Sequence, residues 1–162
     1  MHSDDALYAL AAAVGRAALS RQVRIATAES CTGGLVAAAV TAVAGSSDWF
    51  DRGFVTYSNA AKVEMLAVPA TTLARFGAVS VETARAMAEG ALRLGGAQWS
   101  VAVTGIAGPA GGTPAKPVGT VCFSWAGPHG ADATRHQLEG DRATVRRESV
   151  LIALKGLLER LL

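Results

Sequence analysis

A nearly continuous apolar run, WSVAVTGIAG at residues 99–108, constrains the fold of this chain more than any other feature. A strand with one solvent-facing side alternates apolar and polar residues, whereas a mostly apolar strand is typical of a sheet that is covered on both faces. The glycines at its end open segment 105–119, GIAGPAGGTPAKPVG, whose composition is that of a loop. The run therefore predicts a central strand with helices on both sides.

Segments with helical periodicity precede this run. A first helix, capped by Ser3, is predicted from apolar residues three or four positions apart: Leu7, Leu10, Ala11, Val14 and Ala18. A small-residue helix, GGLVAAAVTAVAG, is expected to end near Gly45. A short helix is expected from Asn59 to Met65, and Pro69 ends that segment because its ring disfavours helical geometry in the preceding residue.

Two longer helices are predicted in the second half of the chain. One covers residues 81–94, with Ser80 as its cap. The other runs from about Asp141 to the chain end. Its buried stripe is expected to consist of Val150, Leu154, Leu157 and Leu161, with Leu151 and Leu158 beside it. Both helices therefore have an apolar side to place against a sheet.

Strand-like segments alternate with these helices. Strands are expected at residues 23–28 and 50–57, and a neighbouring pair at 119–127 and 132–140 is joined by the turn GPHG. Alternating helices and strands followed by a hairpin predict a three-layer α/β/α sandwich with a mixed β-sheet. A chain of 162 residues is long enough for one such domain and short for two, so a single domain over 1–162 is expected.

Composition excludes several functional classes. With 51% apolar and 17% charged residues, the chain is globular rather than disordered. Its net charge of +2, without a dense basic run, argues against electrostatic binding of nucleic acid. No membrane span or signal peptide is apparent, so a cytoplasmic protein is expected. The two cysteines, Cys31 and Cys122, have no metal-ligand spacing and are expected as free thiols.

The stretch ESCTGG at residues 29–34 follows a predicted strand, where ligands of such folds gather. Ser30 is a candidate nucleophile, and backbone amides at a helix start can hold a phosphate or an oxyanion. The alternative is a structural one, because Ser and Thr are common helix caps and glycines allow close packing. Cys31 is a rival nucleophile, since a helix start lowers a thiol pKa.

The stretch TYSNAAK at residues 56–62 lies at the end of another predicted strand. A serine nucleophile needs a base, and Lys62 can serve if burial lowers its pKa, while Tyr57 can relay a proton. A surface lysine and an interfacial tyrosine are the alternative. The chain has twelve Arg but only three Lys, so a lysine here is a weak sign that a group able to lose its proton is required.

Two further stretches fit an anionic ligand. The glycine-rich loop TGIAGPAGG can present backbone donors to phosphate or sugar, although it can equally be a flexible connection. In GDRATVRR, Arg142 in the first turn of the last helix can bind a phosphate, unless that helix start is simply solvated. No His, Asp and Glu cluster indicates a metal, so neither a metal nor a cofactor is expected.

These stretches together resemble the CinA C-terminal domain family, the competence/damage-inducible proteins. The resemblance rests on AESCTGGLVAAAVTAVAGSSDWFDRGFVTYSNAAK, GAVSVETARAMAEGAL, VAVTGIAGPAGGTPAKPVGTV and GDR, and it extends from about Leu7 to the last helix. It implies a stand-alone form of a nicotinamide-nucleotide amidase. Such an enzyme hydrolyses the carboxamide of nicotinamide mononucleotide and releases ammonia and nicotinic acid mononucleotide, a step of pyridine-nucleotide salvage.

The resemblance also implies site residues. The catalytic residues would be Ser30 as nucleophile with Lys62 and Tyr57 assisting it, without a metal. The substrate-binding residues would be Glu29, Cys31, Thr32, Gly33, Gly34, Thr104, Gly105, Gly108 and Arg142, the last of these facing the phosphate. The partners expected are this nucleotide and a second copy of the chain in a dimer, with neither nucleic acid nor membrane.

One departure from the family pattern keeps other functions open. Ala110 stands where the first of three consecutive glycines is usual, and alanine would be strained there if the position requires a positive φ. A catalytically silent module that binds pyridine nucleotides is therefore one alternative. An amidase for a related carboxamide is a second, and a domain that works only as part of an oligomer is a third. Ammonia release from different carboxamides separates the first two from the expected activity.

Overall fold

The computed structural model describes the backbone of residues 2–162 and the side chains of residues 5–162. Its helices are α1 (His2–Arg21), α2 (Leu35–Thr41), α3 (Asn59–Leu66), α4 (Ala70–Phe76), α5 (Val81–Arg93) and α6 (Arg142–Leu161), with a 3-10 turn, η1 (Ser46–Asp48). Its strands are β1 (Ile25–Glu29), β2 (Phe50–Val55), β3 (Trp99–Gly105), β4 (Thr120–Gly127) and β5 (Gly130–Gln137).

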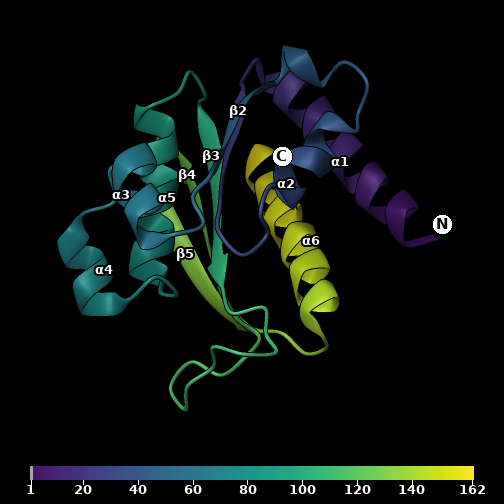
Figure 1. The fold of residues 1–162 in the computed structure, drawn as a ribbon. Coiled ribbons are helices and arrows are strands. Elements are labelled where there is room, and N and C mark those ends of the chain that lie inside the picture. Colours follow the sequence, from purple (N-terminus) through teal and green to yellow (C-terminus); the bar gives the residue numbers. More distant parts are fainter. Residues whose placement is uncertain (1) are drawn as a thin grey trace.

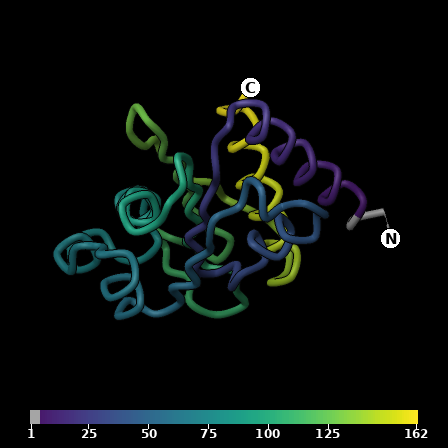
Figure 2. Tube along the Cα trace, turned by 90° about the horizontal axis from the view of Figure 1, so that it is seen from above, coloured from purple at the N-terminus to yellow at the C-terminus, as the bar shows by residue number. Residues whose placement is uncertain are grey.

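The strands form one mixed sheet in the order β2-β1-β3-β4-β5. β1 is parallel to both β2 and β3, whereas β4 is antiparallel to β3 and to β5. β5 therefore runs in the same direction as the three parallel strands. As Figures 1 and 2 show, helices cover both faces of this sheet, which confirms the predicted three-layer α/β/α architecture.

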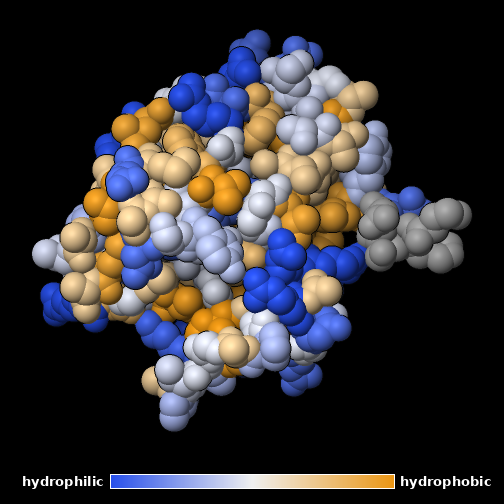
Figure 3. Space-filling model, in the orientation of Figure 1, coloured by the Kyte–Doolittle hydropathy of each residue, from blue (hydrophilic) through white to orange (hydrophobic). Residues whose placement is uncertain are grey.

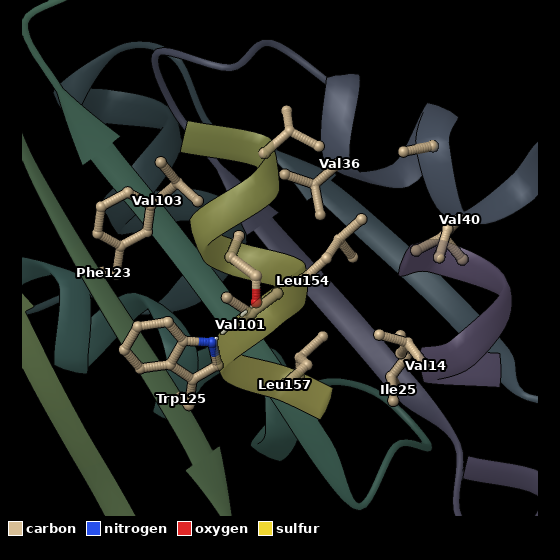
Figure 4. Close-up of a cluster of buried hydrophobic side chains, with 14 of the residues drawn as sticks. Val14, Ile25, Val36, Val40, Val101, Val103, Phe123, Trp125, Leu154 and Leu157 are labelled. Atoms are coloured by element: carbon tan, nitrogen blue, oxygen red, sulfur yellow. Dashed lines mark hydrogen bonds between the residues drawn. The ribbon is translucent and has the colours of Figure 1, made fainter. Parts of the chain in front are cut away.

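One face of the sheet is covered by α1, α2 and α6, which also contact one another. The larger hydrophobic core lies here, and Figure 4 shows Leu154 and Leu157 of α6 packed near Val101 of β3 and Trp125 of β4. The Trp125 indole Nε1 donates to the Ala153 carbonyl at 3.0 Å, so the ring is held to α6 by a hydrogen bond as well as by packing.

The opposite face is covered by α5, and α3 and α4 pack on the outer side of α5. The contact between α3 and α5 is close because α5 has a glycine at the crossing point. A Cβ at Gly90 would lie 2.1 Å from the Leu66 carbonyl oxygen. The backbone of α3 can therefore lie directly against α5, which fixes where α3 presents its side chains.

The predicted caps agree with the structure in part. Ser80 and Asp141 cap α5 and α6, where their side chains accept from the amides of Thr83 and Thr144. Ser58, not the predicted Asn59, caps α3. Ser3 lies within the first turn of α1, and its side chain is outside the described residues.

One predicted helix end was wrong, one helix was not predicted, and the strand expected at 132–140 spans Gly130–Gln137. The helix expected to reach Gly45 ends at Thr41, and the chain continues into η1. The sequence reading also missed α4, which begins directly after Pro69. The φ angle of proline is compatible with a helix start, so this residue opens a helix as well as ending the previous segment.

Strand polarity brings the polar stretches to one edge of the sheet. The carboxyl ends of β1, β2, β3 and β5 lie at the same edge, and α6 begins there after β5. The long loop between β3 and β4 lies at this edge too, at the bottom of Figure 1. In residues 2–162, no helix is long and apolar enough to cross a membrane.

Candidate active site

A cleft of about 280 Å³ lies at the carboxyl edge of the sheet. The side chains of the candidate nucleophile Ser30 and the candidate base Lys62 both line it, together with residues of the β3–β4 loop and the start of α6. Its lining residues are Ser30, Cys31, Tyr57, Lys62, Ala78, Val79, Thr104, Gly105, Ile106, Ala107, Gly108, Ala110, Gly111 and Arg142. A larger groove of about 560 Å³ between α1, α2 and α6 offers no comparable nucleophile–base pair.

Ser30 is held at the end of β1 by the sheet itself. Its amide donates to the Val103 carbonyl of β3 at 2.9 Å. On the other side of β1, the Thr56 amide donates to the Glu29 carbonyl at 2.8 Å. These two bonds extend the strand pairing by one residue beyond β1 and β2. Ser30 and the segment that carries Tyr57 therefore keep a fixed separation.

Lys62 meets Ser30 inside the cleft although the two are 32 positions apart in the sequence. The Lys62 Nζ lies 2.9 Å from the Ser30 Oγ, 2.8 Å from the Thr56 carbonyl oxygen and 3.1 Å from the Tyr57 carbonyl oxygen. The Lys62 side chain is only 1% exposed. Burial lowers the Lys62 pKa from 10.5 to about 8, because water no longer solvates the ammonium.

Cys31 follows Ser30 in the sequence, but its thiol is a weaker acid than an ordinary cysteine. Its thiol is buried, and burial raises the Cys31 pKa from 9.0 to about 11, despite the opposing effects of its backbone amide and of Arg146. A thiol with this pKa is almost entirely protonated near neutral pH, and the thiolate is the nucleophilic form. The Ser30 hydroxyl, by contrast, lies within hydrogen-bonding distance of the Lys62 amine.

Glu29 does not line the cleft; its buried carboxylate instead caps α2. One oxygen accepts from the Thr32 hydroxyl at 2.7 Å and from the Val36 amide at 2.8 Å. The other accepts from the Ala37 amide at 3.1 Å. The expectation that the amides of a helix start remain unpaired was wrong for the first turn of α2, because Glu29 occupies them.

The unpaired amides lie earlier, in the turn between β1 and α2. In the described part of the chain, the amides of Cys31 and Thr32 donate no hydrogen bond to another residue, while the Gly33 amide donates to the Ser30 carbonyl at 3.0 Å. Gly33 and Gly34 have φ angles of 58° and 105°, which favour glycine. Thr32, Gly33 and Gly34 thus shape this turn and do not line the cleft.

Tyr57 lines the cleft, but its hydroxyl points to a different partner than expected. The Tyr57 hydroxyl accepts from the Arg142 Nη2 at 3.3 Å, and the Arg142 Nη1 donates to the Gly108 carbonyl at 2.9 Å. The backbone carbonyl of Tyr57, not its phenol, contacts Lys62 and Ser30. The ring is 63% exposed, so Tyr57 and Arg142 form the outer wall of the cleft.

The glycine-rich loop forms the remaining wall of the cleft. Its backbone shows whether alanine is strained at position 110. Among the described residues other than glycine, only Gln22 and Ala67 have a positive φ, so Ala110 is not strained. Gly108 is one of the positions of this loop that require glycine, together with Gly111 and Gly119. The φ of Gly108 is 85°, and a Cβ there would lie 2.4 Å from the Val118 Cγ1. Ala110 thus lines the cleft without strain.

Thr104 joins this loop to the segment before α5. The Thr104 hydroxyl donates to the Ala78 carbonyl at 2.8 Å, and the Lys116 Nζ donates to the Phe76 carbonyl at 2.7 Å. Ala78 and Val79 also line the cleft. They were not predicted as site residues, because small apolar residues in a loop give no sign of a chemical role. Arg146 was not predicted either, although it lies one helical turn after Arg142 and contacts the Cys31 carbonyl at 3.1 Å.

Comparison with known proteins gives matches over nearly the whole chain. The model of the CinA C-terminal domain family matches residues 7–161. A nicotinamide-nucleotide amidohydrolase PncC of Pseudomonas putida is 48% identical over 155 residues, covering 96% of this chain and 97% of that protein. The solved structure of a competence damage-inducible protein A from Klebsiella pneumoniae superposes with a TM-score of 0.92 at 43% identity, covering 96% of both chains.

A second kind of relative is much longer than this chain. A CinA-like protein of Anaeromyxobacter sp. (strain K) is 56% identical over 135 residues, which cover 83% of this chain but 33% of that protein. The chain therefore spans about a third of that relative.

Proposed function

This chain belongs to the CinA C-terminal domain family, and from this premise we propose that it is a nicotinamide-nucleotide amidohydrolase. The proposed reaction converts nicotinamide mononucleotide and water into nicotinic acid mononucleotide and ammonia, within pyridine-nucleotide salvage. The observation that carries the proposal is the contact of 2.9 Å between the Lys62 Nζ and the Ser30 Oγ at a buried position. A relative that is 48% identical over nearly its whole length bears the name of this activity.

All three neighbours of the Lys62 Nζ can accept, so the protonated amine donates to each of them, while the Ser30 hydroxyl donates to the Tyr57 carbonyl at 3.4 Å. The base of the proposed reaction is the neutral amine that remains once Lys62 has lost its proton. A neutral amine has two N–H groups and one lone pair, whereas an ammonium has three donors. With the two N–H groups on the carbonyls of Thr56 and Tyr57, the lone pair of the neutral amine faces Ser30 and can accept its proton.

In the acylation step, Ser30, Lys62 and the substrate supply every atom and proton that is needed. The Ser30 Oγ forms a bond to the carboxamide carbon, its proton passes to the Lys62 Nζ, and the carbonyl electron pair moves onto oxygen. The pyridinium ring withdraws electrons and makes this carbon easier to attack. The backbone amide of Cys31, which lines the cleft beside Ser30, stabilises the oxyanion, and such a donor contributes on the order of 3 kcal/mol in other enzymes. The C–N bond breaks as Lys62 returns the proton to nitrogen, which leaves as ammonia.

Deacylation uses the same groups in reverse. Water attacks the acyl ester on Ser30 and gives a proton to Lys62, and the bond between the acyl carbon and the Ser30 Oγ then breaks. The Ser30 oxygen regains a proton from Lys62, and nicotinic acid mononucleotide is released. Lys62 is thus base and acid in turn, a role that suits a pKa near 8 better than the ordinary 10.5.

The outer part of the cleft suits the nucleotide portion of the substrate. Arg142 would face the phosphate, and its guanidinium is already oriented by Gly108 and Tyr57. The exposed Tyr57 ring can lie against the cationic pyridinium. Thr104 and Gly105 line the inner wall near Ser30. We propose that Tyr57 assists through this contact and that its backbone carbonyl orients Lys62.

Ammonia release from three carboxamides tests the proposal. Wild-type protein is incubated with nicotinamide mononucleotide, nicotinamide and glutamine, and ammonia is measured. We expect release from the mononucleotide alone. Nucleotide binding without ammonia from any of the three would indicate a silent binding module, and preference for another carboxamide would indicate a related amidase.

Two variants identify the nucleophile. Ser30→Ala is expected to lower kcat by at least roughly 10³-fold, because the covalent step is lost. Cys31→Ala is expected to lose far less, and Cys122→Ala, at a buried position in β4, serves as the matched cysteine control. The reverse order of losses for Ser30 and Cys31 would contradict the assignment.

We also propose that residues 1–162 act as one amidase domain, that the protein is cytoplasmic, and that it forms a homodimer. The dimer proposal rests on exposed apolar side chains of the described chain, among them Leu35, Val55 and Val63. Figure 3 shows such residues interspersed with polar ones on the face that it displays. Light scattering at micromolar concentration tests it, and a monomer mass would exclude a dimer.

A further inference from the structure

Arg146 on α6 contacts the turn that carries the nucleophile, although it does not line the cleft. Its Nε donates to the Cys31 carbonyl at 3.1 Å, and its Nη2 donates to the Thr32 carbonyl at 3.4 Å. A Cβ at Gly33 would lie 3.4 Å from the Arg146 Nη2, so the guanidinium lies directly beside this turn. One guanidinium thus binds two successive carbonyls directly after Ser30.

These contacts determine which way the neighbouring amides point. A trans peptide is planar, so its C=O and the following N–H point in opposite directions. Arg146 holds the Cys31 carbonyl on the α6 side, and this turns the Thr32 amide away from α6. The Ser30 carbonyl is held by the Gly33 amide, which orients the Cys31 amide in the same manner. Within the described turn, the amides of Cys31, Thr32 and Gly34 donate to no other residue, and of these three residues only Cys31 lines the cleft.

The charge of Arg146 also remains available to the turn. Among the described side chains, none of the ion pairs present involves Arg146. The side chain is half-buried, so its field is less screened by water than that of a surface arginine. The positive charge of Arg146 acts on Cys31, where it partly offsets the rise in the thiol pKa that burial causes. The same positive charge favours an oxyanion that develops beside this turn.

Arg142 and Arg146 divide two tasks between them. Both lie on the same side of α6, four positions apart. Arg142 lines the cleft and is bound to the outer wall, where a substrate phosphate can reach it. Arg146 is occupied by the carbonyls of the nucleophile turn. A substrate contact would be expected to raise KM when it is lost, whereas a misplaced oxyanion site would lower kcat.

We infer that Arg146 is a positioning residue, which holds the turn after Ser30 so that the amide of Cys31, the residue of this turn that lines the cleft beside Ser30, binds the oxyanion formed during acyl transfer. This inference rests on the proposed amidohydrolase reaction. It adds a residue of α6 to a site whose nucleophile follows β1 and whose base lies on α3. It also gives α6 a function in catalysis besides the binding of substrate through Arg142.

Steady-state kinetics with nicotinamide mononucleotide test this role. Arg146→Ala is expected to lower kcat on the order of 10²-fold, comparable to the loss of one oxyanion donor, while KM stays within about threefold. Arg146→Lys keeps the charge and can reach one carbonyl, so its kcat should lie between those of Arg146→Ala and the wild type. Added guanidinium at millimolar concentration should restore part of the kcat of Arg146→Ala, which a purely structural loss would not allow.

The control is Arg147→Ala, because Arg147 is the next residue of α6 but lines the groove between α1 and α2. An unchanged kcat in Arg146→Ala, a rise in KM alone, or an equal loss in Arg147→Ala would overturn the inference. If Arg146→Ala does not fold, the kcat of Arg146→Lys decides in its place. A wild-type protein that releases no ammonia would overturn the proposed function itself, and the inference with it.

Discussion

At the scale of single residues, the state of one buried amine governs the chemistry of the cleft. Burial lowers the Lys62 pKa to about 8, so the neutral form becomes abundant as the pH rises through that value. Because the neutral amine is the base, we predict that kcat/KM rises with pH and levels off above about pH 8. A pH–rate profile from pH 6 to 10 measures this.

A surface lysine provides the control for this profile. Lys155 is exposed on α6, and Lys155→Met should have the same pH dependence as the wild type. A profile of the wild type that is flat across pH 8, or one that falls, would contradict the role of Lys62 as the base.

The same residue should make stability depend on pH in a defined direction. Between pH 8 and 10.5 the unfolded chain keeps the Lys62 proton while the folded chain has lost it, so the free energy of unfolding increases with pH there. Below pH 8 Lys62 is protonated in both the folded and the unfolded chain, so the full free-energy cost of burying the ammonium lowers the stability. We predict that the unfolding free energy of wild type minus that of Lys62→Met rises by up to about 3 kcal/mol across this interval.

Urea unfolding at a series of pH values measures this difference. Other titrating groups are common to both proteins and largely cancel. The lost hydrogen bonds to Ser30, Thr56 and Tyr57 add an offset that does not change with pH. A difference that stays constant from pH 8 to 10.5 would show that Lys62 is not shifted.

At the scale of elements, the β3–β4 loop depends on glycine at position 108 but not at position 110. Gly108 has a φ of 85° and its carbonyl accepts from Arg142, so Gly108→Ala should distort both the loop and the outer wall. We predict that kcat/KM falls roughly tenfold or more in this variant, as expected when a binding group is displaced.

Ala110→Gly is the matched variant two positions further along. Ala110 has an ordinary φ, so glycine there only adds freedom to the unfolded chain. It should cost about 0.5 kcal/mol of stability and leave kcat/KM within about twofold. A gain in activity of tenfold in Ala110→Gly would instead mean that alanine impairs this loop.

At the scale of the whole molecule, helix packing sets the position of Lys62. α3 carries Lys62 and lies against α5 at Gly90, where a Cβ would be 2.1 Å from the Leu66 carbonyl. We predict that Gly90→Ala pushes α3 outward, lowers the unfolding free energy by roughly 2 kcal/mol through overpacking, and reduces kcat. Chemical denaturation and kinetics on the same samples measure both effects.

Gly96→Ala is the control for this packing effect. Gly96 lies after α5 and has no positive φ. The atom nearest to a Cβ added there would be the Asp51 Oδ1 at 3.5 Å, which is an ordinary contact. It should change neither quantity appreciably. If Gly90→Ala lost stability without any loss of kcat, the position of Lys62 would not depend on this helix contact.

The sequence by itself determined most of the elements, though not α4, and the edge of the sheet where the polar stretches would meet. Ser80 and Asp141 cap their helices because capping is a contact between residues three positions apart, which a local pattern records. Residues 99–105 of the apolar run form a buried inner strand, because their apolar side chains are covered on both faces of the sheet. The strand-end positions of Ser30 and Tyr57 followed from the same periodicity.

Only the tertiary structure decided which polar groups touch and in which protonation state. Lys62 reaches Ser30 because β2 pairs beside β1, a long-range choice that no local pattern contains. The Tyr57 hydroxyl contacts Arg142, 85 positions away, and Glu29 turns inward to cap α2. The shifted pKa values of Lys62 and Cys31 arise from burial, which exists only once the chain has packed.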